Sequence, residues 1–149
     1  MAHTFANLLA HVIFSTKNRE TLITPKLKAE LLPYMGGIMR NLHGKVIESN
    51  ARPDHYHGLY SFPPTLAVAD AVRVIKTNSS GWVHETCGGT AFAWQIGYGA
   101  FSVSQSNLSD VVEYIRHQDE HHRRLTFQEE FVAFLKRHGI AYDERYIWE

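Results

Sequence analysis

Apolar and polar residues follow two different patterns along the chain, and the first of these patterns predicts β-strands. Leu8–Ser15 is an apolar run with β-branched residues at its centre, which is typical of a strand. Residues 45–50 and His55–Phe62 have a similar character around an Ala-Arg-Pro-Asp turn. Residues 92–96 and 100–104 indicate either a strand pair or one strand bent around a Gly-Tyr-Gly turn. We therefore expect a small β-sheet.

The second pattern, in which apolar residues lie three and four positions apart, predicts helices. Thr24-Pro25 opens the first helix, because a capping hydroxyl precedes proline at the first helical position. Pro33 and Gly36-Gly37 should bend or weaken this helix, and Gly44 suits its C-terminal cap. The other helices are expected over residues 66–76 with a possible continuation over 82–85, over residues 109–121, and after the capping box Thr126-x-x-Glu129.

The order of these elements is strand, helix, strand, strand, helix and strand, followed by two helices. The first six elements match the split β-α-β arrangement of ferredoxin-like domains. We therefore predict a single α+β domain over residues 1–149, with a ferredoxin-like antiparallel sheet, helices on one face, and C-terminal helices that carry Tyr114. The sheet face that the first two helices leave uncovered should be a functional site or an interface.

Composition places the chain among ordinary soluble proteins. Its 149 residues are 44% hydrophobic and 20% charged, which is enough for one compact core. No apolar run approaches the roughly 20 residues of a membrane span, and the N-terminus has no signal-peptide pattern. The single cysteine, Cys87, excludes an internal disulfide framework and fits a reducing compartment. We therefore expect a cytoplasmic protein with no membrane partner.

A histidine pair at the start of one expected strand is the first candidate for chemistry. Side chains alternate across a strand, so His55 and His57 share one face and Tyr56 points to the other. Two imidazoles about 6–7 Å apart along a rigid strand can converge on one cation. The pair alone is a weak signal, because two histidines at this spacing often occur by chance.

A tyrosine in the expected helix over residues 109–121 is the second candidate. Residues four apart on a helix lie on one face, so Tyr114 and Gln118 project together, and His121 falls near them. Tyr114 lies beside the apolar stripe of this helix and not within it. Taken alone, this pattern is more typical of a boundary tyrosine with a solvated hydroxyl.

Several blocks of the sequence together resemble the single-tyrosine HUH transposases of the smallest bacterial and archaeal insertion sequences. The blocks are residues 11–19, residues 52–57 with the histidine pair, residues 94–102, and Tyr114 with Gln118 four positions later. They occur in order from about residue 5 to the C-terminus, so the resemblance does not depend on one motif. Tyr56 and Gly58 depart from it, because that family usually has aliphatic residues at these two positions.

The resemblance implies a metal-dependent DNA enzyme. His55 and His57 would bind a divalent cation, Mg²⁺ or Mn²⁺, with Gln118 as a third ligand, and Tyr114 would be the nucleophile. The substrate would be single-stranded DNA with hairpins at the transposon ends, cut through a 5′-phosphotyrosine link. The enzyme would be a homodimer in which the tyrosine helix of one subunit sits against the histidine pair of the other.

Contacts with DNA are expected from basic residues near these blocks. The formal net charge of zero weighs against nonspecific duplex binding, which depends on neutralising phosphates, but a local basic surface suffices for specific contacts. The candidate phosphate-binding residues are Lys17, Arg19, Arg52, Arg116, Arg123 and Arg124.

Two other functions fit part of the pattern. A domesticated hairpin-DNA-binding protein would keep the fold without transposition activity. An unrelated metal-dependent hydrolase would use the two histidines, but it would leave Tyr114 and Gln118 without a role.

Overall fold

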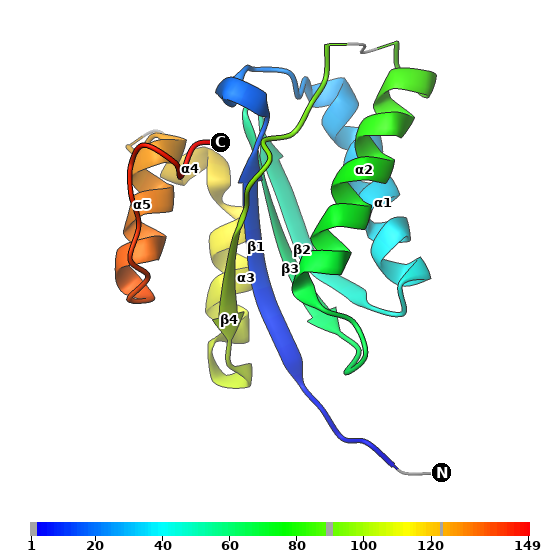
Figure 1. Ribbon diagram of the computed structural model, residues 1–149, viewed down its shortest axis with the longest axis vertical. Helices are drawn as coiled ribbons and strands as arrows, with labels where there is room; N and C mark the ends of the chain where they lie inside the picture. Colours follow the sequence, from blue (N-terminus) through cyan, green and yellow to red (C-terminus); the bar gives the residue numbers. More distant parts are fainter. Residues whose placement is uncertain (1–2, 89–90, 123) are drawn as a thin grey trace.

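The computed structural model describes residues 3–88, 91–122 and 124–149, and it shows a four-stranded sheet with helices on both faces (Figure 1). The strand order is β2-β3-β1-β4, and each neighbouring pair is antiparallel. This is the ferredoxin-like α+β architecture that the element order predicts. The strands are β1 (Leu8–Ser15), β2 (Lys45–Arg52), β3 (His55–Phe62) and β4 (Gly99–Val103).

Two sets of helices enclose the sheet. Figure 1 shows α1 and α2 on one face, and the C-terminal helices on the other. The first set covers the larger core, and α5 covers a second apolar cluster built on Ile13 and Phe101. The helical elements are α1 (Pro25–Asn41), α2 (Val68–Thr86), α3 (Leu108–Arg116), α4 (Gln118–His121) and α5 (Phe127–Arg137), with short 3-10 turns η1 (Lys17–Arg19) and η2 (Gln105–Asn107).

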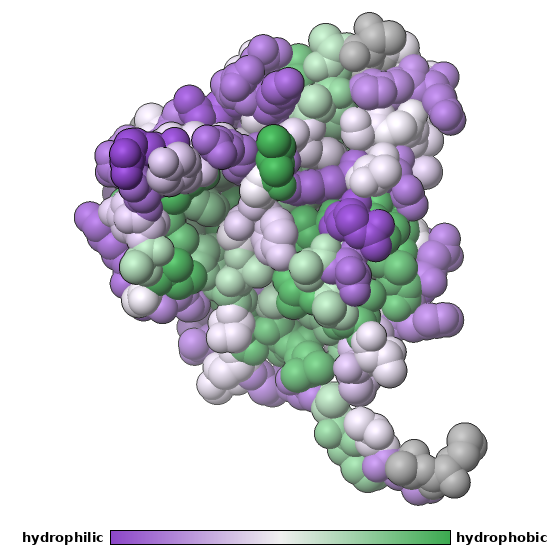
Figure 2. All heavy atoms as spheres, in the orientation of Figure 1, coloured by the Kyte–Doolittle hydropathy of each residue, from purple (hydrophilic) through white to green (hydrophobic). Residues whose placement is uncertain are grey.

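Figure 2 shows the molecular surface in the orientation of Figure 1. Apolar side chains lie mostly in the middle and lower part of this surface, near β4. Hydrophilic side chains gather around its periphery. Among the described residues, no helix is long and apolar enough to cross a membrane.

The first helix begins as predicted and ends differently. Thr24 Oγ1 accepts a hydrogen bond of 3.1 Å from the backbone N–H of Leu27, which is the expected N-cap. The helix continues through Pro33 to Asn41. Gly44 belongs to the C-terminal cap, since its N–H donates a 3.0 Å hydrogen bond to the Met39 carbonyl oxygen, but His43 and not Gly44 takes the left-handed conformation, with φ of 64°. A Cβ at Gly44 would also meet the end of the Met39 side chain and lie 3.0 Å from the Ser61 carbonyl oxygen, so the position is tightly packed.

The second helix is one continuous element, and the expected strand over residues 92–96 does not form. Ser79, where a break was expected, is buried and accepts a 2.9 Å hydrogen bond from Trp94 Nε1. Trp94 pairs with Thr16 only as an isolated bridge. Lys76 Nζ donates to the carbonyl oxygens of residues 95, 96 and 97, which holds this segment as a loop.

The single helix predicted over residues 109–121 is two helices. The chain leaves helical geometry at His117, with φ of −100° and ψ of 33°, so α3 ends at Arg116 and α4 begins at Gln118. Tyr114 and Gln118 therefore lie on either side of a break and do not share one helix face.

Two buried tyrosines explain why Gly58 departs from the aliphatic pattern. Tyr56 and Tyr60 lie in the core cluster with α1 and α2, and their hydroxyl oxygens are 2.6 Å apart. Gly58 lies between them on the same strand face. A Cβ at Gly58 would come within 2.6 Å of the Tyr60 ring, so the ring occupies the space that an aliphatic side chain would need.

Substituting this glycine should destabilise the protein. We expect Gly58→Ala to lower the free energy of unfolding by about 1–3 kcal/mol, because the buried Tyr60 ring must move. Gly81→Ala is the matched control: its Cβ would meet nothing within 4 Å in the described structure. Alanine there should be neutral or stabilising by up to about 1 kcal/mol. Urea unfolding measures both, and equal stability of Gly58→Ala and the wild type would contradict this packing.

Candidate metal and nucleophile site

The histidine pair of β3 is buried and faces the C-terminal helices. His55 and His57 are 1% and 0% exposed. The Nδ1 atom of each is engaged: His55 Nδ1 donates to Asp54 Oδ1 at 2.7 Å, and His57 Nδ1 is 2.9 Å from His11 Nε2. The two Nε2 atoms lie 3.5 Å and 3.0 Å from Glu130 Oε1. The strand therefore presents both Nε2 atoms to one point, as side-chain alternation predicts.

Glu130 is a central residue of this site that the sequence reasoning missed. It lies on α5 among the residues of the apolar face and is only 2% exposed. Its Oε1 lies 3.2 Å from Nε2 of His122, and its Oε2 accepts a hydrogen bond from the Tyr114 hydroxyl. One signal was available: a carboxylate within the apolar stripe of an amphipathic helix is costly unless it has partners.

The four side chains around this point form a cluster that can hold a metal ion. Ligand atoms of His55, His57, His122 and Glu130 all lie within 4.8 Å of one another. Within the described part of the chain, buried His55 Nε2 has no hydrogen-bond partner. Imidazole nitrogens with a carboxylate oxygen suit a divalent cation. A cation bound here would therefore give His55 Nε2 a partner.

Electrostatics in the cluster favour different protonation states for its three members His55, His57 and Glu130. Burial opposes the charge of Glu130, but the imidazoles of His122, His55 and His57 that surround its Oε1 outweigh burial and hold its pKa well below the usual range. Burial lowers the pKa of His57 despite Glu130. At His55, burial lowers the pKa, but the hydrogen bond to Asp54 and the nearby Glu130 carboxylate outweigh burial and raise it. The cluster thus combines a carboxylate anion with a neutral His57, and these are forms that bind metal ions.

Tyr114 lies against the histidines of its own chain. Its ring centroid is 6.1 Å from that of His57 and 4.5 Å from that of His121, on which it stacks. Burial, together with the negative charge of Glu130, raises the pKa of the hydroxyl. The hydroxyl is therefore protonated at neutral pH. Before it can attack, the negative charge of Glu130 that stabilises the protonated form must be offset by a nearby positive charge.

Gln118 is buried next to both groups. Its Nε2 donates a 3.2 Å hydrogen bond to the Tyr114 carbonyl oxygen, and its Oε1 lies 3.0 Å from His122 Nε2. The structure thus brings Gln118 beside the cluster through His122, across the break between α3 and α4.

Two of the arginines that were predicted to contact DNA form ion pairs between the sheet and the helices α3 and α4. Arg52 Nη1 lies 2.5 Å from Asp119 Oδ1, and Arg116 Nε lies 2.8 Å from Glu48 Oε2. Both pairs are partly exposed and are worth little stability individually. They link α4 and α3, respectively, to β2.

A cleft of about 450 Å³ leads from the surface to the cluster. His55 and His122 lie at it, and Arg52 and Arg124 supply cationic side chains to its lining. Lys17 and Arg19 lie in η1, where the Arg19 guanidinium is 5.5 Å from the Trp148 ring. Arg123 lies outside the described residues.

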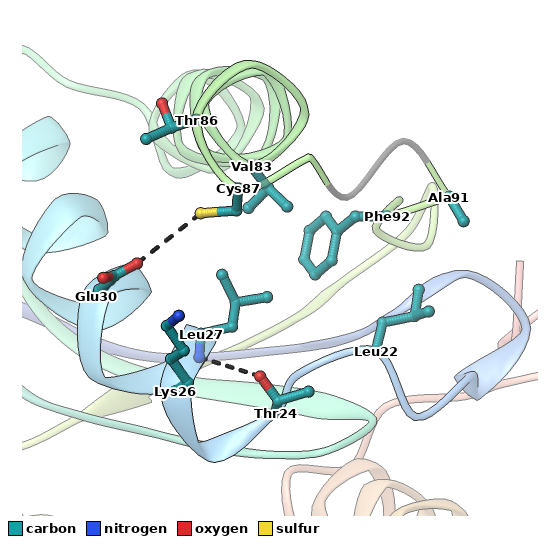
Figure 3. Close-up of a pocket in the computed structure, with 10 residues that line it drawn as sticks. All are labelled: Leu22, Thr24, Lys26, Leu27, Glu30, Val83, Thr86, Cys87, Ala91 and Phe92. Carbon is teal, nitrogen blue, oxygen red and sulfur yellow. Dashed lines mark hydrogen bonds between the residues drawn. The ribbon is translucent and has the colours of Figure 1, made fainter.

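A second hollow, of about 530 Å³, lies between the start of α1 and the end of α2 (Figure 3). In Figure 3, the Cys87 thiol points toward Glu30, 3.9 Å from its Oε2. The described residues that line this hollow include none of the histidine cluster, so the two sites are separate.

Comparisons with known proteins place the chain in a transposase family. Residues 4–118, well over half of the chain, match the family described as "Transposase IS200 like". The chain therefore belongs to the IS200-like transposase family. The matched region includes His55, His57, Tyr114 and Gln118, and it ends before His122 and Glu130.

Individual relatives agree with the family. The transposase for insertion sequence element IS200 of Salmonella typhimurium is 29% identical over 131 residues, which cover 80% of this chain and 82% of the relative. A Deinococcus radiodurans R1 crystal structure assigned as a transposase has a TM-score of 0.61 at 20% identity, covering 79% of this chain and 95% of that one. A REP-associated tyrosine transposase bound to a REP hairpin has a TM-score of 0.60 at 16% identity, covering 82% and 73%. At these identities, the two structures show that the fold is shared.

Proposed function

We propose that this transposase cuts and rejoins single-stranded DNA at transposon ends through a covalent link to Tyr114, with a divalent cation bound at the histidine pair. The observation that carries the proposal is the position of the Tyr114 hydroxyl. It hydrogen-bonds the same carboxylate that contacts His57, so nucleophile and candidate metal ligands share one buried site. A hydrolase that used the histidines alone would give this tyrosine no role.

His55, His57 and Gln118 would hold the cation, which we propose to be Mg²⁺ or Mn²⁺. When bound, it offsets the negative charge of the scissile phosphate and orients that group for in-line attack. The protein supplies rigid ligands for it, since Asp54 and His11 fix the Nδ1 atoms of the two histidines.

The covalent step conserves the phosphodiester bond energy. The Tyr114 oxygen bonds to phosphorus, loses its proton to solvent, and becomes a 5′-phosphotyrosine. The bond from phosphorus to the 3′ oxygen breaks, and that oxygen gains a proton and leaves as a free 3′-hydroxyl. Attack by a 3′-hydroxyl on the phosphotyrosine reverses the exchange and rejoins the strands, so no nucleotide cofactor is needed.

Single-stranded DNA carrying a hairpin is the proposed substrate. The cleft past Arg52 and Arg124 gives a phosphate backbone a cationic route to the cluster. Lys17, Arg19, Arg116 and Arg123 are proposed to contact further phosphates. The related tyrosine transposase was solved bound to a REP hairpin, which supports this substrate class.

A homodimer with shared active sites, in the cytoplasm, remains part of the proposal. Exchange of the tyrosine helix between subunits would require α3 to leave its own sheet. The contacts to be broken include the hydrogen bond from the Tyr114 hydroxyl to Glu130 of the same chain, the 2.8 Å hydrogen bond from Asn50 Nδ2 to the Ile115 carbonyl, and the Arg116–Glu48 ion pair.

The proposal predicts a metal-dependent covalent adduct. Mixing the protein with Mn²⁺ and labelled single-stranded hairpin DNA from its own genomic flanks should give a protein–DNA species that survives denaturing electrophoresis. Excess chelator should abolish it, because the phosphate charge is then not offset. The same sequence as a blunt duplex is the control substrate. Equal adduct with and without chelator would contradict the metal role, and tight hairpin binding without any adduct would favour the domesticated binding protein.

A further inference from the structure

We propose that Glu130 and His122, which lie beyond the matched family region, complete the metal site, and that Glu130 also tethers the nucleophile. Glu130 would bind the cation through Oε1 and hold the Tyr114 hydroxyl through Oε2. This inference rests on the proposed function. It adds two residues of the C-terminal segment to the metal ligands His55, His57 and Gln118, and it gives one of them, Glu130, the further role of holding the nucleophile.

The distances from Glu130 Oε1 to the three imidazole nitrogens are close to those between neighbouring ligands of one cation. Metal–nitrogen and metal–oxygen bonds of about 2.0–2.1 Å place neighbouring ligand atoms about 2.8–3.4 Å apart at octahedral or tetrahedral angles. Glu130 Oε1 lies 3.5, 3.0 and 3.2 Å from Nε2 of His55, His57 and His122. Gln118 Oε1 lies 3.0 Å from His122 Nε2. The ligand atoms of His55, His57, His122 and Glu130 all lie within 4.8 Å of one another, so side-chain shifts would let one cation contact them together.

The directions of the hydrogen bonds around Glu130 require a proton or a metal ion between its carboxylate and the imidazole Nε2 atoms. His55 Nδ1 donates to the Asp54 carboxylate, and His122 Nδ1 lies 2.8 Å from the carbonyl oxygen of Leu125, to which it can only donate. In their neutral forms, both rings therefore present an Nε2 lone pair toward the Glu130 carboxylate. Lone pairs that face each other at these distances repel unless a proton or a metal ion lies between them. A divalent cation satisfies all of them together, including buried His55 Nε2, which has no partner among the described residues.

The two oxygens of Glu130 connect metal and nucleophile within one chain. The capping box at Thr126 fixes the start of α5, and buried Phe127 and Phe131 hold the turn that carries Glu130. The helix thus sets the carboxylate between the histidines and the Tyr114 hydroxyl. Glu130 is accordingly a metal ligand for the bound ion and a positioning residue for the tyrosine.

The test is Mn²⁺ binding to the full chain without DNA, measured by calorimetric titration and by the loss of the free-ion electron paramagnetic resonance signal. Glu130→Gln keeps the side-chain volume and should weaken binding by about 10-fold or more, as expected for a lost anionic ligand. Glu113→Gln is the matched control, because it removes the same charge from an exposed position on α3. Thermal unfolding verifies that both variants are folded.

The outcomes separate this inference from the proposed function. If Glu130→Gln binds Mn²⁺ as tightly as Glu113→Gln, while His57→Ala does not bind, the ligand role of Glu130 is wrong and the histidine metal site stands. If His57→Ala also binds normally, the metal site itself fails. His122→Asn should weaken binding in the same assay, and unchanged binding would remove His122 from the ligand set.

The tether is tested at saturating Mn²⁺ for each variant. Glu130→Gln keeps an oxygen that can accept from Tyr114, so its rate of adduct formation should recover toward the wild-type rate. Glu130→Ala has no acceptor and should remain at least about 10-fold slower. Equal rates for the two variants at saturating metal would overturn the positioning role.

Discussion

Replacing Tyr114 with phenylalanine should abolish the covalent protein–DNA adduct while leaving the fold and metal binding intact. The substitution removes the attacking oxygen and keeps the ring that stacks on His121. Removing an essential nucleophile costs at least about 10³-fold in rate, so no adduct should be detectable. Denaturing electrophoresis of labelled hairpin DNA measures the adduct, and Mn²⁺ titration measures the metal site.

The control is Tyr146→Phe, which removes a hydroxyl from a residue that is 60% exposed. It should form the adduct at the wild-type rate. An adduct that persists in Tyr114→Phe would show that another residue attacks the DNA.

Replacing His57 with alanine should have the second largest effect, on the metal. His57 is fully buried and its Nε2 faces the Glu130 carboxylate at 3.0 Å. Loss of an outer-shell partner typically costs about 10–100-fold in metal affinity, so loss of a direct ligand should exceed this range. Mn²⁺ titration should show no saturable binding at micromolar metal, and adduct formation should fall in parallel.

His117→Ala serves as the matched control, since this exposed imidazole lies on the break between α3 and α4 and outside the metal-binding cluster of the described residues. Its Mn²⁺ affinity should equal that of the wild type. If His57→Ala retains wild-type affinity, the ion binds elsewhere and the cluster is only a set of hydrogen bonds.

Local signals in the sequence predicted the elements well where local interactions determine them. Thr24 and Thr126 cap their helices as expected, because a cap depends on residues three positions away. The alternation of β3 put His55 and His57 on one face, because strand geometry requires it. Element order then sufficed for the ferredoxin-like sheet.

The errors occur where distant residues determine the local structure. The break at His117 interrupts a segment with uniform helical periodicity, and its neighbour Arg116 is bound to Glu48 of β2. The segment that contains Trp94 is a loop because Trp94 is bound to Ser79 of α2 and Lys76 binds the neighbouring carbonyls. Periodicity within one segment contains no information about such contacts.

The candidate site was half predictable for the same reason. His55, His57, Tyr114 and Gln118 belong to sequence blocks with a recognisable spacing. Glu130 reaches His57 from 73 positions away, and only its place in an apolar stripe marked it. Whether a carboxylate in such a stripe meets a cation, an imidazole or a tyrosine depends on how α5 packs on the sheet, which spacing alone does not give.

The most direct test of the proposed mechanism is to locate the covalent bond. The wild-type adduct formed with Mn²⁺ and hairpin DNA would be digested with nuclease and protease and analysed by tandem mass spectrometry. We predict a nucleotide phosphate attached to the peptide that contains Tyr114, through the 5′ phosphate of the cleaved strand. Attachment to any other residue, or cleaved DNA with free 5′ phosphate and no modified peptide, would contradict the mechanism.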